Sequence, residues 1–231
     1  YATEYIYSNI TGNDFITPKM AYGINIGCLN TDFNEGPATK NVFIDFSGNE
    51  LRTDSGGVLR ITSSDNLDLD MTRNDIYGTG NTCGGIFLGW FQDDEENRAA
   101  RTARMNIKNN TITDVAAGSL TLYAEDYLQA DIQNNTLNKA SGGGIVLGGM
   151  MAPDPVVDAK ICYNTVGSGT DAGIKVTNSN NTLIFANNIT SRSGWSGTSN
   201  SSAAANRRVR SSGPWRRRPC ATSPTASLPS R

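Results

Sequence analysis

Apolar and polar residues alternate along most of the chain in short segments that recur in one pattern. The pattern is an apolar residue, two further residues, an asparagine, one residue and a second apolar residue. Its seven copies begin at Ile10, Phe46, Met71, Ile107, Ile132, Ile161 and Ile184. In most copies another apolar residue lies two positions earlier, as at Ile44 and Leu69. This period of two predicts a β-strand with one buried face.

A second pattern falls between the asparagines and consists of a small residue followed by apolar, variable and apolar positions. It occurs at Gly23–Ile26, Gly85–Leu88, Ser119–Leu122, Gly144–Leu147 and Gly173–Val176, with a looser match near Gly57. Each repeat therefore predicts three short strands separated by turns. Successive asparagines are 36, 25, 36, 25, 29 and 23 residues apart. Short strands and tight turns at this period are typical of one coil of a solenoid.

These patterns predict an all-β protein, a parallel β-helix of about seven coils over residues 1–192. Each strand would pair with its equivalent one coil away, at ~4.8 Å per coil. Asparagine tolerates left-handed backbone angles, so we expect positive φ at positions such as Asn110. Stacked asparagine side chains can also hydrogen-bond along the axis as a ladder. The inward core is predicted to contain Ile26, Leu88, Leu122, Leu147 and Val176.

The alternation of Gly-Ile-x-Leu strands with Ile-x-Asn-Asn-Thr-Ile turns resembles the right-handed parallel β-helix repeat proteins of the pectate lyase-like superfamily. The resemblance covers about residues 5–190. It implies a secreted or cell-envelope protein that acts on polysaccharide, although the fold hosts lyases, glycosidases, epimerases, phage tailspikes and adhesins. In enzymes of this superfamily the groove usually lies on the face formed by the first strands. Here that face corresponds to the Gly-Ile-x-Leu strands.

Alternation places one side chain of each Gly-Ile-x-Leu strand on the outside of the solenoid. The predicted outward row contains Asn25, Arg60, Phe87, Thr121, Val146 and Lys175. Lys175 and Arg60 are its only cations and the candidate catalytic residues. Burial can lower the pKa of a lysine and make it a base, whereas arginine stays charged. A solvated sheet face without a ligand is the alternative.

The longest predicted loop follows the strand at 85–88 and contains two large rings. Sugar rings can stack on aromatic side chains, so the loop and its neighbours form a candidate substrate-binding surface. Its residues are Phe87, Trp90, Phe91, Thr121 and Tyr123. Covering an exposed edge of the core is the alternative role for the rings.

The same loop carries four consecutive acids, Asp93, Asp94, Glu95 and Glu96. Calcium prefers several carboxylate oxygens, so these residues are candidate ligands for a calcium ion. A glycosidase with paired carboxylates and an ordinary solvated loop surface are the alternatives.

Catalytic motifs of the superfamily are matched only in part. Polygalacturonase-like strings are present as Asn30-Thr31-Asp32, Asp93-Asp94 and Gly173-Ile174-Lys175, but the Gly-His-Gly element is missing because the chain contains no histidine. The absence of histidine also excludes a Ser-His-Asp or Cys-His nucleophile pair and histidine-ligated zinc. The four cysteines contain no Cys-x-x-Cys pair, which disfavours a disulfide framework or metal knuckle.

Charge divides the chain into two parts. The net charge of −2 combines an acidic body with a basic segment, 193–231, rich in arginine, proline, serine and alanine. We predict this segment to be a disordered tail, because it holds too few apolar residues to offset its ordering entropy. Its abrupt change of composition, which leaves the last coil uncapped, favours a cloning or reading-frame artefact and a truncated solenoid over nucleic-acid binding. The chain begins at Tyr1 with neither an initiator methionine nor a signal-peptide pattern, so we expect either a mature chain or a fragment of a longer one. No apolar run reaches the ~18 residues of a membrane-spanning helix.

Two classes of function follow from these observations. The first is a carbohydrate-active protein, a lyase or glycosidase relative acting on polysaccharide, which the long aromatic loop and Lys175 favour. The second is a non-catalytic carbohydrate-binding, adhesin-like or structural module, which the missing histidine and the acidic charge favour. A relative of the accessory proteins of nitrous-oxide reductase is a third, more distant alternative.

Overall fold

The computed structural model describes residues 4–17, 22–27, 39–54, 57–78, 85–93, 96–115, 120–140, 144–148, 155–168, 173–190 and 195–197. Within this part of the chain every regular element is a β-strand. None of the described residues belongs to a helix with the length and hydropathy needed to cross a membrane.

Three parallel sheets of seven strands each run along the molecule. The long sheet contains β1 (Tyr5–Thr11), β4 (Asn41–Ser47), β7 (Asn66–Thr72), β12 (Thr102–Lys108), β15 (Tyr127–Gln133), β18 (Val156–Cys162) and β21 (Ser179–Phe185). The second sheet contains β2 (Asp14–Thr17), β5 (Glu50–Thr53), β8 (Asp75–Gly78), β13 (Thr111–Thr113), β16 (Thr136–Ala140), β19 (Thr165–Ser168) and β22 (Asn188–Ile189). The third sheet contains β3 (Tyr22–Ile26), β6 (Gly57–Ile61), β9 (Ile86–Leu88), β14 (Leu120–Leu122), β17 (Ile145–Leu147), β20 (Ile174–Val176) and β23 (Trp195–Gly197).

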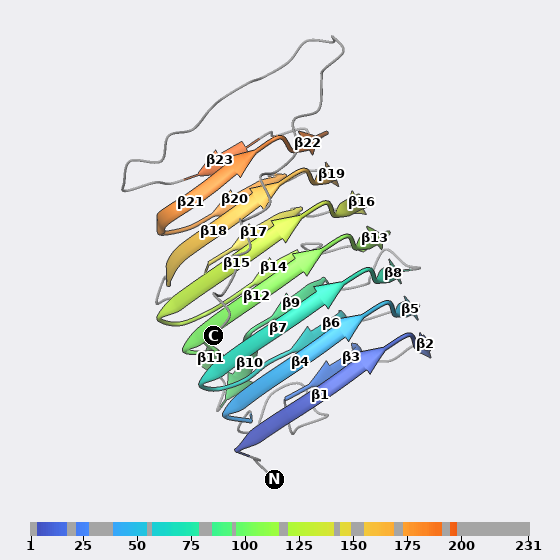
Figure 1. Ribbon diagram of the computed structural model, residues 1–231, viewed down its shortest axis with the longest axis vertical. Coiled ribbons are helices and arrows are strands. Elements are labelled where there is room, and N and C mark those ends of the chain that lie inside the picture. The colour runs from blue at the N-terminus through green and yellow to red at the C-terminus, as the bar shows by residue number, and fades with distance from the viewer. Residues whose placement is uncertain are drawn as a thin grey trace, which may run out of the picture.

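Each coil contributes one strand to each sheet, and successive coils stack from β1 at the foot of Figure 1 to β21 near its top. The register aligns the repeats as the sequence predicts: Ile10 pairs with Phe46, and Phe46 with Met71. The parallel β-helix prediction is therefore confirmed. Strand β23 places residues 195–197 beside β20, and the rest of the predicted tail lies outside the described residues.

The core fills the space between the three sheets. Leu88, Leu122 and Leu147 are fully buried and Val176 is nearly so, as predicted. Ile26, in the first coil, is only partly buried and packs against this core. The inward alternation of each long-sheet strand adds residues such as Met71 and Ile132, both fully buried. Period-two patterning thus determines which face of each strand is removed from water.

The asparagine ladder lies at the turn between the long sheet and the second sheet. Its members are Asn13, Asn49, Asn74, Asn110, Asn135, Asn164 and Asn187. In each step the backbone N–H and the side-chain Nδ2 of one asparagine donate to the Oδ1 of the next, at 2.8–3.1 Å. Nδ2 also donates to a backbone carbonyl one coil back, as from Asn110 to Met71. The stack from Asn49 to Asn164 is confirmed, and its buried amides are satisfied along the axis.

The left-handed residue of each turn is not the ladder asparagine but the residue before it. Positive φ angles of 54–67° occur at Gly12, Gly48, Arg73, Asn109, Asn134, Tyr163 and Ala186. The prediction of positive φ at Asn110 is therefore wrong. The ladder position instead needs an ordinary backbone with a side chain that points along the stack, so its asparagine is selected for hydrogen bonding.

Candidate functional site

The outward row of the third sheet has the predicted register. Asn25 pairs with Arg60, Arg60 with Phe87, and Phe87 with Thr121. Thr121 then pairs with Val146, and Val146 with Lys175. The structure therefore brings all six residues into one line parallel to the solenoid axis.

Much of this row is not open to solvent. Arg60 and Thr121 are each 2% exposed and Val146 is 8% exposed. Phe87 and Lys175 are half-buried, and Asn25 is exposed. An outward direction on a sheet does not ensure exposure, because further parts of the chain can cover that face.

The predicted loop after β9 is in fact a β-hairpin. Strands β10 (Trp90–Asp93) and β11 (Glu96–Ala99) pair antiparallel, with Trp90 opposite Ala99. A hydrogen bond from the N–H of Ala100 to the carbonyl of Gly89, at 2.9 Å, closes the base of the hairpin. The hairpin lies at the side of the solenoid from which the long-sheet strands start (Figure 1). It is therefore an insertion at the corner between the third sheet and the long sheet.

Trp90 at the base of the hairpin covers Arg60. The Nε of Arg60 donates to the carbonyl oxygen of Trp90 at 3.2 Å. Its guanidinium carbon lies 4.6 Å from the centre of the Trp90 ring, a cation–π contact. The Phe87 and Trp90 ring centroids are 5.8 Å apart, at an interplanar angle of 52°. Both rings keep part of their surface in solvent. The candidate surface therefore consists of two tilted rings, of which Trp90 packs over the buried Arg60 guanidinium.

Tyr123, another predicted ring of this surface, is a core residue at the next corner. It is 7% exposed, and burial raises its pKa to about 12. A tyrosine removed from water in this way offers little ring surface to a ligand. The backbone of Phe91 lies in β10, and its side chain falls outside the described residues.

The two candidate catalytic residues are far apart. Arg60 and Lys175 are separated by four strand steps along the row, which corresponds to ~19 Å at ~4.8 Å per step. Among the described residues of the row, none is a carboxylate. Arg60 and Lys175 therefore cannot act on the same bond, and Lys175 has no acid partner within the described row.

The predicted calcium ligands fall largely outside the described residues. Asp94 and Glu95 are not described, and for Asp93 and Glu96 only the backbone is. Elsewhere in the described chain no group of three His, Cys, Asp or Glu side chains is arranged to hold a metal ion. The calcium site remains a prediction.

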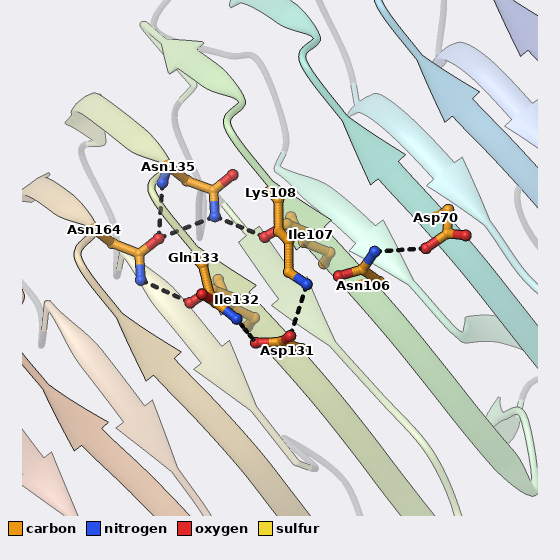
Figure 2. Close-up of polar contacts among 9 residues, drawn as sticks. All are labelled: Asp70, Asn106, Ile107, Lys108, Asp131, Ile132, Gln133, Asn135 and Asn164. Carbon is orange, nitrogen blue, oxygen red and sulfur yellow. Dashed lines mark hydrogen bonds and ion pairs between the residues drawn. The ribbon is translucent and has the colours of Figure 1, made fainter. Parts of the chain in front are cut away.

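A second polar surface, which sequence reasoning missed, covers the outer face of the long sheet. Asn106 Nδ2 donates to Asp70 Oδ1 at 2.7 Å, and Lys108 Nζ lies 2.7 Å from Asp131 Oδ2 (Figure 2). Gln133 Nε2 also donates to Asp131. Period-two alternation identifies these side chains as outward, but only the coil register shows which of them meet.

Comparison of the chain with protein-family models, with curated proteins and with solved structures finds no match. The fold and the geometry of its surfaces therefore carry the functional argument.

Proposed function

We propose that this protein is a secreted or cell-envelope β-helix of the pectate lyase-like type that binds polysaccharide through the paired rings of Trp90 and Phe87. The observation that carries the proposal is the fixed position of the Trp90 ring. The backbone carbonyl of Trp90 accepts a hydrogen bond from Arg60, and the Trp90 ring packs over the same guanidinium. Phe87 supports the ring from the neighbouring strand.

A ring held in this way suits a sugar ligand. The C–H face of a sugar ring packs against an aromatic face, and an immobilised side chain loses little further entropy when the ligand binds. The partly exposed rings lie beside a row that runs along the axis at ~4.8 Å per coil. Because Arg60, Thr121 and Val146 of that row are buried, the contact with a polysaccharide is confined to the exposed parts of the two rings.

Binding without catalysis is the form of the proposal that the geometry favours. The separation of Arg60 from Lys175 and the absence of a carboxylate from the described row remove the simplest acid–base pairs. A lyase or glycosidase would need an acid or base within hydrogen-bond reach of its substrate. The enzyme alternative therefore depends on Lys175, and its test is separate.

Binding can be measured by affinity electrophoresis and calorimetry with pectate, alginate and neutral glycans, each with and without calcium. We expect Trp90→Ala to weaken glycan binding about tenfold, because an aromatic anchor contributes ~1–2 kcal/mol. Trp90→Phe should retain part of the affinity, since it keeps a ring. Unchanged binding by a folded Trp90→Ala variant would reject this site.

Turnover of the same glycans tests the enzyme alternative. Loss of product formation in Lys175→Ala, with binding preserved, would establish a catalytic role for the lysine. If the wild-type chain binds a glycan without converting it, the binding function stands alone.

A further inference from the structure

Three aromatic rings lie at one end of the outer face of the long sheet, on β1 and β4. The rings of Tyr5 and Tyr7 stack with centroids 6.0 Å apart and planes 11° apart. Tyr7 and Phe43 stack at 4.7 Å and 7°. Tyr5 is 54% exposed and Tyr7 is 71% exposed. We call these three nearly parallel rings the aromatic corner.

Side chains that can form hydrogen bonds lie next to the aromatic corner, in register on the neighbouring strands. The register continues from Tyr5 to Asn41 and Asn66, and from Tyr7 through Phe43 to Asp68. The adjacent row runs from Asn9 to Asp45 and Asp70. All of these residues face the same side of the sheet, because they occupy alternate positions of their strands. The arrangement combines open ring surface with amide and carboxylate groups in one plane.

The border of the aromatic corner is negatively charged. Asp45, Asp68 and Asp70 contribute three carboxylates, and none of the nine residues at these positions of β1, β4 and β7 is a cation. Arg104 on β12 lies in register beside Asp68, so the surface keeps an excess of negative charge. The nearby Lys40 is paired with Glu4 at 2.9 Å. A polyanion such as a uronate chain would be repelled here, whereas the hydroxyl groups of a neutral sugar can donate to carboxylate and amide oxygens.

We propose that the aromatic corner is a second glycan site, which binds a neutral polysaccharide by stacking sugar rings on Tyr7 and Tyr5. It deepens the proposed function and rests on it for the class of ligand. The two sites lie on different sheets, since Trp90 covers the third sheet and Tyr7 lies on the long sheet. One chain can therefore hold two glycan segments.

Ile16 provides a matched control, which separates the effect of exposed apolar area from the effect of the stacked rings in the aromatic corner. Ile16 lies on β2 in the same coil and is 69% exposed, close to the value for Tyr7, but it has no ring. If exposed apolar area alone mattered, as in self-association of the chain, removing the side chain of Tyr7 or of Ile16 would have the same effect. A site for sugar stacking would respond only to the loss of Tyr7.

The test uses calorimetry of the full chain with cellohexaose, xylohexaose, mannohexaose and a galacturonate hexamer. It is performed in the Trp90→Ala background, so that the remaining binding reports the aromatic corner. We expect Tyr7→Ala to weaken binding of a neutral hexasaccharide by about 2- to 10-fold, the range of a single aromatic contact. Tyr7→Phe and Ile16→Ala should remain within about twofold of the parent.

The outcomes separate the two sites. If Trp90→Ala alone removes all binding, or if Tyr7→Ala binds like its parent, the aromatic corner is not a glycan site. An equal loss in Ile16→Ala, or tighter binding of the galacturonate hexamer, would also overturn the proposal. If Tyr7→Ala weakens binding while Trp90→Ala in the wild-type chain changes nothing, the aromatic corner stands and the third-sheet site fails.

Discussion

At the scale of single residues, two adjacent asparagines have different tasks. Asn109 is exposed and has a φ of 59°, the conformation that glycine adopts at the equivalent positions 12 and 48. Asn110 is buried, and its Oδ1 accepts hydrogen bonds from both the backbone N–H and Nδ2 of Asn74. The first asparagine serves the backbone of the turn, and the second links three coils.

Glycine substitution at the two positions should distinguish these tasks. Asn109→Gly keeps the turn and should change the free energy of unfolding by less than about 1 kcal/mol. Asn110→Gly leaves the donors of Asn74 and the carbonyl of Met71 buried without their partner, and should cost about 2–4 kcal/mol. Urea unfolding followed by circular dichroism measures the free energy of unfolding of both variants. Because each variant introduces one glycine, the added backbone entropy of the unfolded chain is the same in both. Equal destabilisation would contradict separate roles.

Tyr123 should make stability depend on pH in the alkaline range. Its pKa is raised by burial to about 12, above the ordinary tyrosine value of 10.0. Below pH 10 the phenol is neutral in both states, so its contribution is fully present. Between pH 10 and 12 the unfolded chain ionises first, and the stabilisation is lost as pH rises, by about 2–3 kcal/mol in total.

The difference between wild type and Tyr123→Phe isolates this effect, because the remaining titrating groups are shared. The stability gap between the two proteins should be constant from pH 7 to 9.5 and should shift against the wild type above pH 10. Unfolding by urea at fixed pH values measures the gap. A constant gap up to pH 12 would show that the phenol ionises equally in both states.

At the scale of elements, the corners between the third sheet and the long sheet alternate in composition. Gly27, Gly89 and Gly148 follow β3, β9 and β17 with φ angles of 88°, 89° and 85°. Thr62, Tyr123 and Thr177 hold the equivalent positions after β6, β14 and β20. Each corner with a glycine begins a long connection to the next long-sheet strand, and each corner with Thr or Tyr begins a short one. This difference explains why the first four asparagine spacings alternate between 36 and 25 residues. The hairpin that carries Trp90 is one of these insertions.

Such a corner requires glycine for two reasons: its φ is positive, and there is no space for a Cβ atom. A Cβ atom at Gly89 would overlap the carbonyl oxygen of Tyr123, whereas a Cβ atom at Gly48 would meet its nearest neighbour, the Gly12 nitrogen, only at 4.0 Å. Gly48→Ala should therefore cost ~1–2 kcal/mol for its left-handed backbone. Gly89→Ala should cost ~1–3 kcal/mol more for the overlap.

Thermal unfolding measures the two glycine variants side by side. Gly89→Ala should also weaken glycan binding, because the corner sets the position of Trp90, while Gly48→Ala should bind normally. Similar melting temperatures for the two variants would show that the corner can relax around a Cβ atom.

At the scale of the whole molecule, stability comes from stacking coils that cannot bury their apolar faces alone. Ile132 in a middle coil is fully buried, whereas Ile10 and Ile184 in the same inward row are only partly buried because they lie in the first and last described coils. Both proposed glycan surfaces lie on outer faces of the solenoid, where side chains do not serve the core. Function can therefore vary on these faces without disturbing the stack.

The amino-acid sequence by itself determined the repeat, the strand register and the inward residues, because period-two alternation and recurring asparagines are local signals repeated at nearly constant spacing. It also identified the ladder, although not that Asn109, rather than Asn110, takes the left-handed angle. Only the tertiary structure decided that Arg60 is buried under Trp90, that Tyr123 belongs to the core, and that Tyr5, Tyr7 and Phe43 stack in the open. These features depend on contacts between coils and on the fold of an inserted hairpin, and neither is encoded in the periodicity of a single strand.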